Sequence, residues 1–271
     1  MQRKRPELGP LEIQLLAYTQ LRKQDVIRTG EMSPILGINS KQERELLSRM
    51  ARSGLLIRLK RGMYLAPSRV PPGGRWAVSE YFILSKLMEA YEGKYQISGP
   101  NAFNFYGYDD QIPNRIYVYN NKLVGDKNVG GTEFVFMKTS DKRLGSTNIL
   151  KIANGLKTIM VSRTRALMDA VYDWSRYNTI PRAYNWITQS LKQDPKFATE
   201  LIKVTSRYGN TATIRRIGYL LTTCGVAKDE LTILNKKAGS PKSFIAFIPG
   251  RDRKGYINKE WRLIINNASS K

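Results

Sequence analysis

Histidine is absent from the 271 residues, and cysteine occurs once, as Cys224. The first absence removes the commonest general base and the commonest zinc ligand, and the second excludes an internal disulfide and any cysteine-rich metal site. Neither a phosphate-binding P-loop nor the glycine fingerprint of dinucleotide-binding folds is present. No apolar run approaches the roughly 18 residues that a membrane helix needs. We therefore expect a protein that is not an enzyme, holds no cofactor or metal and spans no membrane.

Acidic residues are also scarce, at 22 against 45 Lys and Arg, which gives a net charge of +23. Such an excess repels itself unless the partner is a polyanion. The net charge is +7 over residues 1–62, +1 over 63–140 and +15 over 141–271. The C-terminal half is therefore also expected to contact nucleic acid or an acidic protein. The basic N-terminus has no apolar segment behind it, and we expect a cytoplasmic, nucleoid-associated protein.

Residues 29–66 carry the most informative pattern. Thr29 to Leu36 predicts a short helix, and Gly37 marks its end because glycine adopts the left-handed conformation without steric cost. Ser40 is expected to cap a second helix, with Glu43 completing a capping box. A basic hairpin follows, and this order of elements predicts a winged helix-turn-helix that places its second helix in the major groove of DNA.

The second helix separates into two faces at about 100° per residue. The predicted packing face comprises Glu43, Leu46, Leu47, Met50 and Ala51. The opposite face is basic and hydrogen-bonding, and the predicted DNA contacts on it are Lys41, Arg44, Ser48, Arg49 and Arg52. The arginines among them are the expected base readers, through bidentate contact with guanine. The alternative interpretation is an ordinary amphipathic helix with a solvated charged face.

The hairpin is predicted from alternation. Leu55 to Leu59 alternates like a strand, residues 60–62 form a Lys-Arg-Gly turn, and residues 63–65 return as the partner strand before Pro67. We expect Lys60 and Arg61 at this turn to contact phosphate or the minor groove.

Around this module, Pro10 is predicted to open a supporting helix, so residues 1–67 form an N-terminal DNA-binding domain. A Pro- and Gly-rich linker at 68–75 leads to a mixed α/β C-terminal domain at 76–271, which makes the fold class α+β. In that domain, GDKNVGG at 125–131 is read as a turn between strands at 115–119 and 132–137. Helices are expected at 76–91, 101–106, 165–172, 181–191, 196–208 and 211–223, and further strands at 149–153, 158–161, 243–248 and 261–266.

Two further features favour structural roles. Cys224 is expected to be a buried thiol at the end of a helix. Asp169 and Asp173 lie one helical turn apart and in principle suit Mg²⁺, but a satisfied or solvated pair is the favoured interpretation.

The chain resembles the AbiEi family, the antitoxin and transcriptional repressor of type IV AbiE-type toxin–antitoxin (abortive infection) systems. The resemblance rests on LIRLKRGMYLAP at 56–67, YQISGPNAFNFYGY at 95–108, IMVSRTRALMDAVYD at 159–173, IRRIGYLLTTCGV at 214–226 and WRLIIN at 261–266. It implies an N-terminal winged helix that binds inverted repeats in its own promoter, and a C-terminal domain that neutralises a cognate nucleotidyltransferase toxin, with or without a stable complex. The predicted C-terminal contacts to nucleic acid or toxin are Arg163, Arg165, Arg215 and Arg216.

Two rival hypotheses remain open. One is a stand-alone regulator or architectural DNA-binding protein without a toxin partner. The other is a nucleic-acid enzyme with a dispersed acidic site that includes Asp169.

Overall fold

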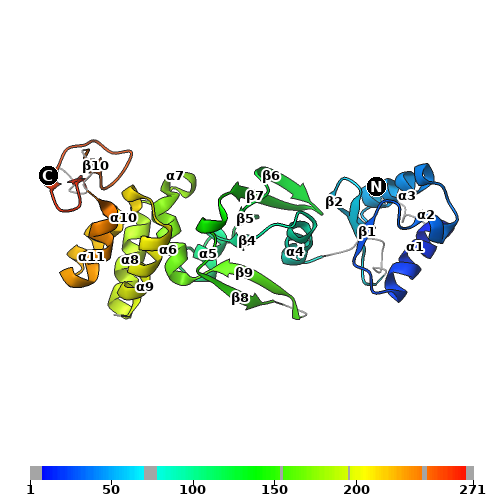
Figure 1. Cartoon of the computed structure of the whole chain (residues 1–271), viewed down its shortest axis with the longest axis horizontal. Helices are drawn as coiled ribbons and strands as arrows, with labels where there is room; N and C mark the ends of the chain where they lie inside the picture. Colours follow the sequence, from blue (N-terminus) through cyan, green and yellow to red (C-terminus); the bar gives the residue numbers. More distant parts are fainter. Residues whose placement is uncertain (1–7, 70–77, 153–154, 195, 240–242, 267–271) are drawn as a thin grey trace. The chain divides into compact units, whose positions relative to one another are not determined.

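The computed structural model describes residues 8–69, 78–152, 155–194, 196–239 and 243–266 (Figure 1). They form a mixed α and β fold, as expected, divided between two compact units. The first unit comprises Met1–Tyr95, Asn114–Asp141 and Ile149–Thr158, and the second comprises Gln96–Pro113, Lys142–Asn148 and Ile159–Lys271. Most of the predicted linker at 68–75 lies outside the described residues, so the predicted domain boundary stays a prediction.

The first unit begins with three helices and a small sheet. The helices are α1 (Pro10–Leu21), α2 (Ser33–Leu36) and α3 (Ser40–Ser53), and the strands are β1 (Val26–Arg28), β2 (Ile57–Lys60) and β3 (Met63–Leu65). The sheet is antiparallel in the order β1-β3-β2. Its inner face and the helices share one apolar core of Leu15, Leu16, Ile27, Met32, Leu46, Leu47, Met50, Leu55, Leu56, Tyr64 and Ala66.

The start of α3 differs from the prediction. Asn39 is the N-cap, and its side chain accepts hydrogen bonds from the backbone N–H groups of Lys41 and Gln42. Gln42 returns a bond to the Asn39 backbone, so the capping box lies one residue earlier than Ser40 and Glu43. Amide groups at these two positions satisfy the same helix-end donors, which leaves Glu43 available for another role. Gly37, at φ 63°, ends α2 in the left-handed conformation as predicted.

The rest of the first unit holds α4 (Glu80–Ala90), β5 (Arg115–Asn120), β6 (Gly125–Val129) and β7 (Thr132–Lys138). Strands β5 and β7 pair in parallel, and β6 pairs antiparallel with β7. The interpretation of GDKNVGG as a turn is therefore wrong, because residues 125–129 form a strand and only Gly130 and Gly131 turn the chain. Four of the five β6 residues are exposed, so the strand has no apolar alternation to reveal it.

The second unit is mainly helical. It contains α5 (Pro100–Phe105), α6 (Arg163–Tyr172), α7 (Trp174–Tyr177), α8 (Arg182–Gln193), α9 (Phe197–Tyr208), α10 (Thr211–Thr223) and α11 (Lys228–Ala238). The division between the units falls within strands β4 (Tyr95–Ile97), β8 (Thr147–Lys151) and β9 (Lys157–Val161), and β4 pairs in parallel with β9 at Ile97 and Met160. The expected helices are present, whereas α7 and α11 were not predicted.

The last strands, β10 (Ile245–Ala246), β11 (Tyr256–Asn258) and β12 (Leu263–Ile265), form a sheet in the order β10-β12-β11. This segment packs on α10 at Gly218, which has no side chain. The Trp261 indole lies against Gly218 so closely that a Cβ atom there would overlap the ring. The indole N–H also donates to Thr222 Oγ1 at 3.0 Å. One face of α10 therefore forms the seat for Trp261, which is fully buried.

Cys224 corrects another expectation. The residue caps the C-terminal end of α10, and its thiol is exposed rather than buried. The helix ends at Gly225 in the left-handed conformation, and the preceding residue falls outside the packed face of α10. Within the described parts of the chain, no helix combines the length and apolar character needed to cross a membrane.

Candidate nucleic-acid interface

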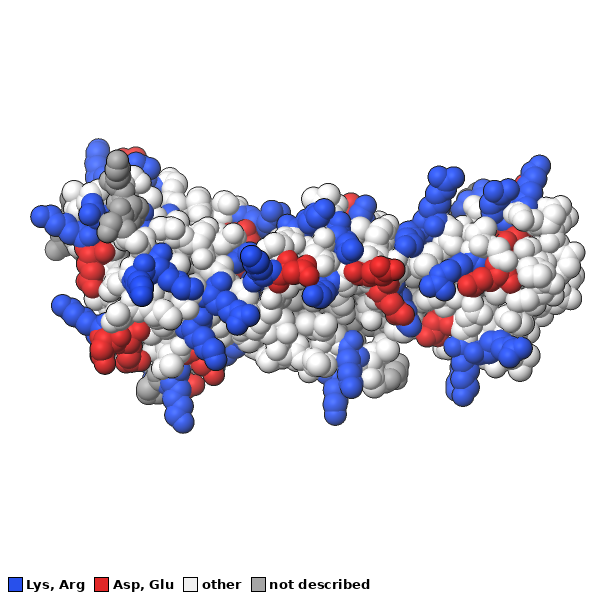
Figure 2. All heavy atoms as spheres, in the orientation of Figure 1, with Lys and Arg blue, Asp and Glu red and all other residues white. Residues whose placement is uncertain are grey.

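Helix α3 presents one buried and one exposed face, as its sequence predicts. Glu43, Leu46, Leu47 and Met50 are buried. On the opposite side Lys41, Arg44, Arg49 and Arg52 are exposed, and Ser48 is half-buried. Figure 2 shows Lys and Arg side chains projecting around these N-terminal elements. The structure therefore brings all five predicted α3 contacts to one accessible, positively charged face.

Glu43 holds the turn that leads into this helix. Its carboxylate is fully buried and accepts hydrogen bonds from the backbone N–H groups of Gly30 and Met32, both at 2.8 Å. Buried carboxylates are retained where they satisfy such donors. This contact sets where α2 begins relative to α3. The signal in the sequence was an acidic residue on the otherwise apolar face.

Arg49 forms an ion pair that sequence reasoning missed. Its Nε lies 3.0 Å from Glu12 Oε1 on α1, and the Arg49 side chain stays 58% exposed. The other Glu12 oxygen accepts from the backbone N–H of Gly9 at the start of α1. By contrast, Arg44 and Arg52 form no ion pair with any described residue, so their guanidinium groups are the more available for an external anion.

The turn between β2 and β3 separates its two predicted cations. Gly62 adopts φ 74°, which glycine tolerates best, and Arg61 beside it is exposed. Lys60 instead donates to the backbone carbonyl of Ala90, and its Nζ lies 4.9 Å from the centre of the Tyr91 ring. The Lys60 ammonium is therefore engaged with α4 and the residue after it, and Arg61 is the cation presented at the turn.

Arg58 adds a cation that was not on the predicted list. It lies in β2 between the buried Ile57 and Leu59, and its side chain is exposed. A hollow of about 500 Å³ opens beside it, lined by Arg52, Arg58 and the β6–β7 turn at residues 128–131. The alternation of apolar and basic residues at 57–59 was the signal that placed Arg58 on the outer face.

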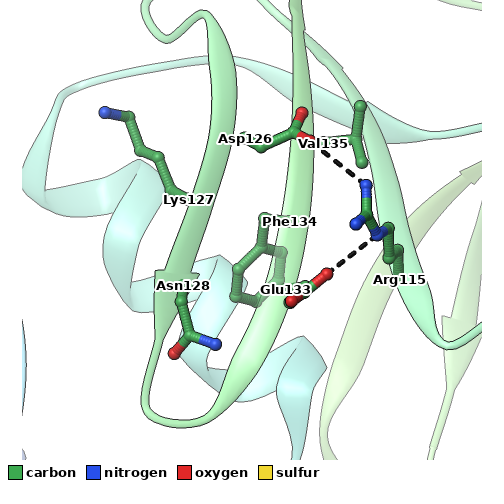
Figure 3. Close-up of a pocket in the computed structure, with 7 residues that line it drawn as sticks. All are labelled: Arg115, Asp126, Lys127, Asn128, Glu133, Phe134 and Val135. Carbon is green, nitrogen blue, oxygen red and sulfur yellow. Dashed lines mark hydrogen bonds and ion pairs between the residues drawn. The ribbon is translucent and has the colours of Figure 1, made fainter.

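A second hollow, of about 150 Å³, lies over β5, β6 and β7 (Figure 3). Arg115 crosses it: its Nη1 lies 3.2 Å from Asp126 Oδ2, and its Nε lies 2.8 Å from Glu133 Oε2. These pairs join three neighbouring strands at an exposed surface, where ion pairs are typically worth about 0–1 kcal/mol. The two carboxylates outnumber the single guanidinium, and we assign this cluster a structural role.

Three of the four predicted C-terminal contact residues are buried. Arg165 has no exposed surface, and its Nε lies 3.0 Å from both carboxylate oxygens of Asp169. Arg143 Nη2 and Ser98 Oγ complete the partners of that carboxylate, at 3.0 and 3.1 Å. Burial lowers the pKa of Arg165, and the charge of Asp169 opposes the shift. Asp169 is thus satisfied internally, and the prediction of an external contact through Arg165 is wrong.

Arg215 and Arg216 lie on α10 and are likewise buried. Arg215 donates to the carbonyls of Trp261 and Arg262, and Arg216 donates to the carbonyl of Ala246. Both guanidinium groups hold the last sheet on the helix, so the prediction that they contact a partner is also wrong.

Arg163 is the remaining member of that set. It is half-buried, and its Nε donates to the Tyr108 hydroxyl at 2.6 Å. Its Cζ also lies 5.6 Å from the centres of the Tyr108 and Phe197 rings. Its prediction as a partner contact is left untested by this geometry.

Residues 14–67 match a family model described as a transcriptional regulator, AbiEi antitoxin. No curated protein matches the chain. Among solved structures, the crystal structure of the RV2827C protein from Mycobacterium tuberculosis aligns with a TM-score of 0.59 and 15% identity, over 95% of this chain and 92% of that one. At this identity the likeness shows a shared fold alone. The predicted resemblance to the AbiEi family is confirmed over residues 14–67, which match its antitoxin transcriptional regulators.

Proposed function

We propose that the protein is a DNA-binding transcriptional repressor and the antitoxin of a type IV toxin–antitoxin system. The observation that carries the DNA-binding part is the exposed basic face of α3, whose opposite face is buried in the core of residues 15–66. In this proposal residues 8–66 act as a winged helix-turn-helix. Helix α3 enters the major groove, and the β2–β3 hairpin is the wing.

The role proposed for each of these side chains depends on whether it is available to contact DNA. Arg44 and Arg52 read bases, since neither is held by an ion pair among the described residues, while Lys41 and Ser48 position the helix on phosphate. Arg61 contacts phosphate or the minor groove from the wing. Arg49 reads a base only after its ion pair with Glu12 is replaced by a contact with DNA.

The target is an inverted repeat in the promoter of the protein's own operon, occupied by two protomers. The second unit opposes a cognate nucleotidyltransferase toxin, with or without a stable complex, and no catalytic activity is assigned to this chain. Support for the toxin partner comes from the family match over residues 14–67. Support for a polyanionic partner comes from the net charge of +23.

A gel-shift and footprint on the DNA upstream of the gene, at about 150 mM salt, tests the repressor proposal. We expect protection over inverted repeats that Arg44→Ala and Arg52→Ala weaken selectively, since each bidentate guanine contact discriminates by about 1–3 kcal/mol. Binding of equal strength to every sequence would contradict it and favour an architectural DNA-binding protein. Toxin rescue is a separate test, by co-expression with the proposed cognate nucleotidyltransferase.

A further inference from the structure

The second unit contains a hollow of about 510 Å³ that the proposed function does not use. Its walls come from three places in the chain: the start of β8 with Thr147 and Asn148, the start of α6 with Ser162 and Thr164, and the exposed side of α9 with Lys203 and Arg207. This volume falls in the range of small-molecule sites. The lining mixes apolar and polar surface and carries the exposed cations Lys203 and Arg207.

Two cations line one wall at helical spacing. Lys203 and Arg207 are four residues apart on α9, which places their Cβ atoms about 5–6 Å from one another on the same face. Both side chains are exposed, and neither forms an ion pair with a described residue. The opposite face of α9 is buried through Leu201 and Thr205, so the direction of the two cations is set by the packing of the helix.

The facing wall supplies neutral hydrogen-bonding groups. The hydroxyl of Ser162 lies 2.8 Å from that of Ser146 and 3.2 Å from that of Thr164. Hydroxyls rotate to donate to an oxyanion, whereas the paired cations neutralise its charge. Glu200 is the one carboxylate among the described lining residues. Because Lys203, Arg207 and Arg163 also line the hollow, the net charge of the lining is positive.

We propose that this hollow binds the phosphate groups of a nucleotide-sized ligand. Lys203 and Arg207 each take one phosphate of a diphosphate or triphosphate, and the hydroxyls of the facing wall orient it. The volume of about 510 Å³ is that of a small-molecule site, whereas a nucleic-acid backbone is tracked by extended grooves. This assignment also relocates the anion contact of the C-terminal half, because three of the arginines predicted to make it are buried.

Calorimetric titration of the full chain with pyrophosphate, and separately with ATP, tests the proposal. We expect saturable binding that Lys203→Ala and Arg207→Ala each weaken by at least about tenfold, the loss typical of one charge-assisted hydrogen bond. Glu200→Gln should strengthen pyrophosphate binding, because it removes the one negative charge of the lining, which repels pyrophosphate. Lys192→Ala, an exposed cation on α8 outside the hollow, is the matched control and should leave the affinity unchanged.

Circular dichroism of each variant checks the fold, which exposed substitutions should preserve. Absence of binding by both ligands, or equal binding by the variants and the parent, would overturn the proposal. A third titration uses a short single-stranded oligonucleotide. If that ligand alone binds, the site is part of a nucleic-acid surface and the small-ligand proposal fails. None of these results depends on the operator footprint, so the two proposals fail separately.

Discussion

The Nε of Arg49 lies 3.0 Å from Glu12 Oε1. This ion pair joins α1 to α3, the helix that we propose reads DNA. Replacing Glu12 by Gln keeps an acceptor for the Gly9 N–H and removes the charge that holds Arg49. We expect stability to change by about 1 kcal/mol or less, since Arg49 is largely exposed. Affinity for duplex DNA should rise, with a steeper salt dependence in anisotropy titrations. Unchanged salt dependence would show that Arg49 stays away from DNA.

Glu43→Ala should loosen the turn before α3. It removes the acceptor of the Gly30 N–H and of the buried Met32 N–H, and hydrogen bonds to a charged group contribute about 1.5–3 kcal/mol each. We expect the local stability of α2 and α3, measured by amide hydrogen exchange, to fall by roughly 2 kcal/mol or more. Glu45→Ala on the exposed face is the control, with an expected change within about 0.5 kcal/mol.

The two cations of the hairpin turn should behave differently. Arg61→Ala is expected to lower the salt dependence of DNA binding by about 0.9, the slope for one neutralised phosphate. Lys60→Met should leave that slope unchanged, because the Lys60 ammonium is held by Ala90 and Tyr91. Equal losses in the two variants would mean that Lys60 leaves α4 to bind DNA.

Arg165→Met should destabilise the second unit strongly. The substitution leaves the Asp169 carboxylate buried with one fewer cation, and breaking a buried pair from one side costs about 3–5 kcal/mol. Urea unfolding followed by Trp fluorescence measures the change. Lys192→Met, exposed on α8, should alter stability by less than about 0.5 kcal/mol. A comparable effect of both variants would show that the Arg165–Asp169 pair adds little.

Asp173 predicts a pH dependence. Burial raises the pKa of its carboxyl to about 6, and nearby Arg176 opposes the shift. The folded state therefore holds this proton more tightly than the unfolded chain, so stability is lost as pH rises from about 4 to about 6. Asp173→Asn should stabilise the protein at pH 7.5 by on the order of 1 kcal/mol and have little effect at pH 4. Equal effects at both values would exclude this titration.

The sequence predicted a structural feature correctly where the residues that determine it are neighbours in the chain. Gly37 and the apolar stripe of α3 act within a few residues, and both were predicted correctly. Strand β6 is exposed and is held by backbone pairing with β7, which leaves no side-chain pattern to detect. Helix α11 buries only Leu231 and Leu234 and was missed for the same reason.

The candidate site shows the same division. The exposed face of α3 follows from helical periodicity, and all its predicted residues are accessible or half-buried. Burial of Arg215 and Arg216 depends on partners far away in the chain, Trp261 and Ala246, which composition does not reveal. Only Arg165 and Asp169, at i and i+4, offered a local signal. The anionic partner expected from the net charge of +23 stays a prediction.

The seat of Trp261 on Gly218 also has a consequence for synthesis on the ribosome. Helix α10 cannot bury this face until residue 261 has emerged, 43 residues after position 218. At typical rates of about 5–20 residues per second, the helix waits roughly 2–9 s with Arg215 and Arg216 lacking their carbonyl acceptors. The apolar cluster of the module proposed to bind DNA draws all its members from residues 8–66. A nascent chain would therefore hold a complete α3 face before its second unit is finished.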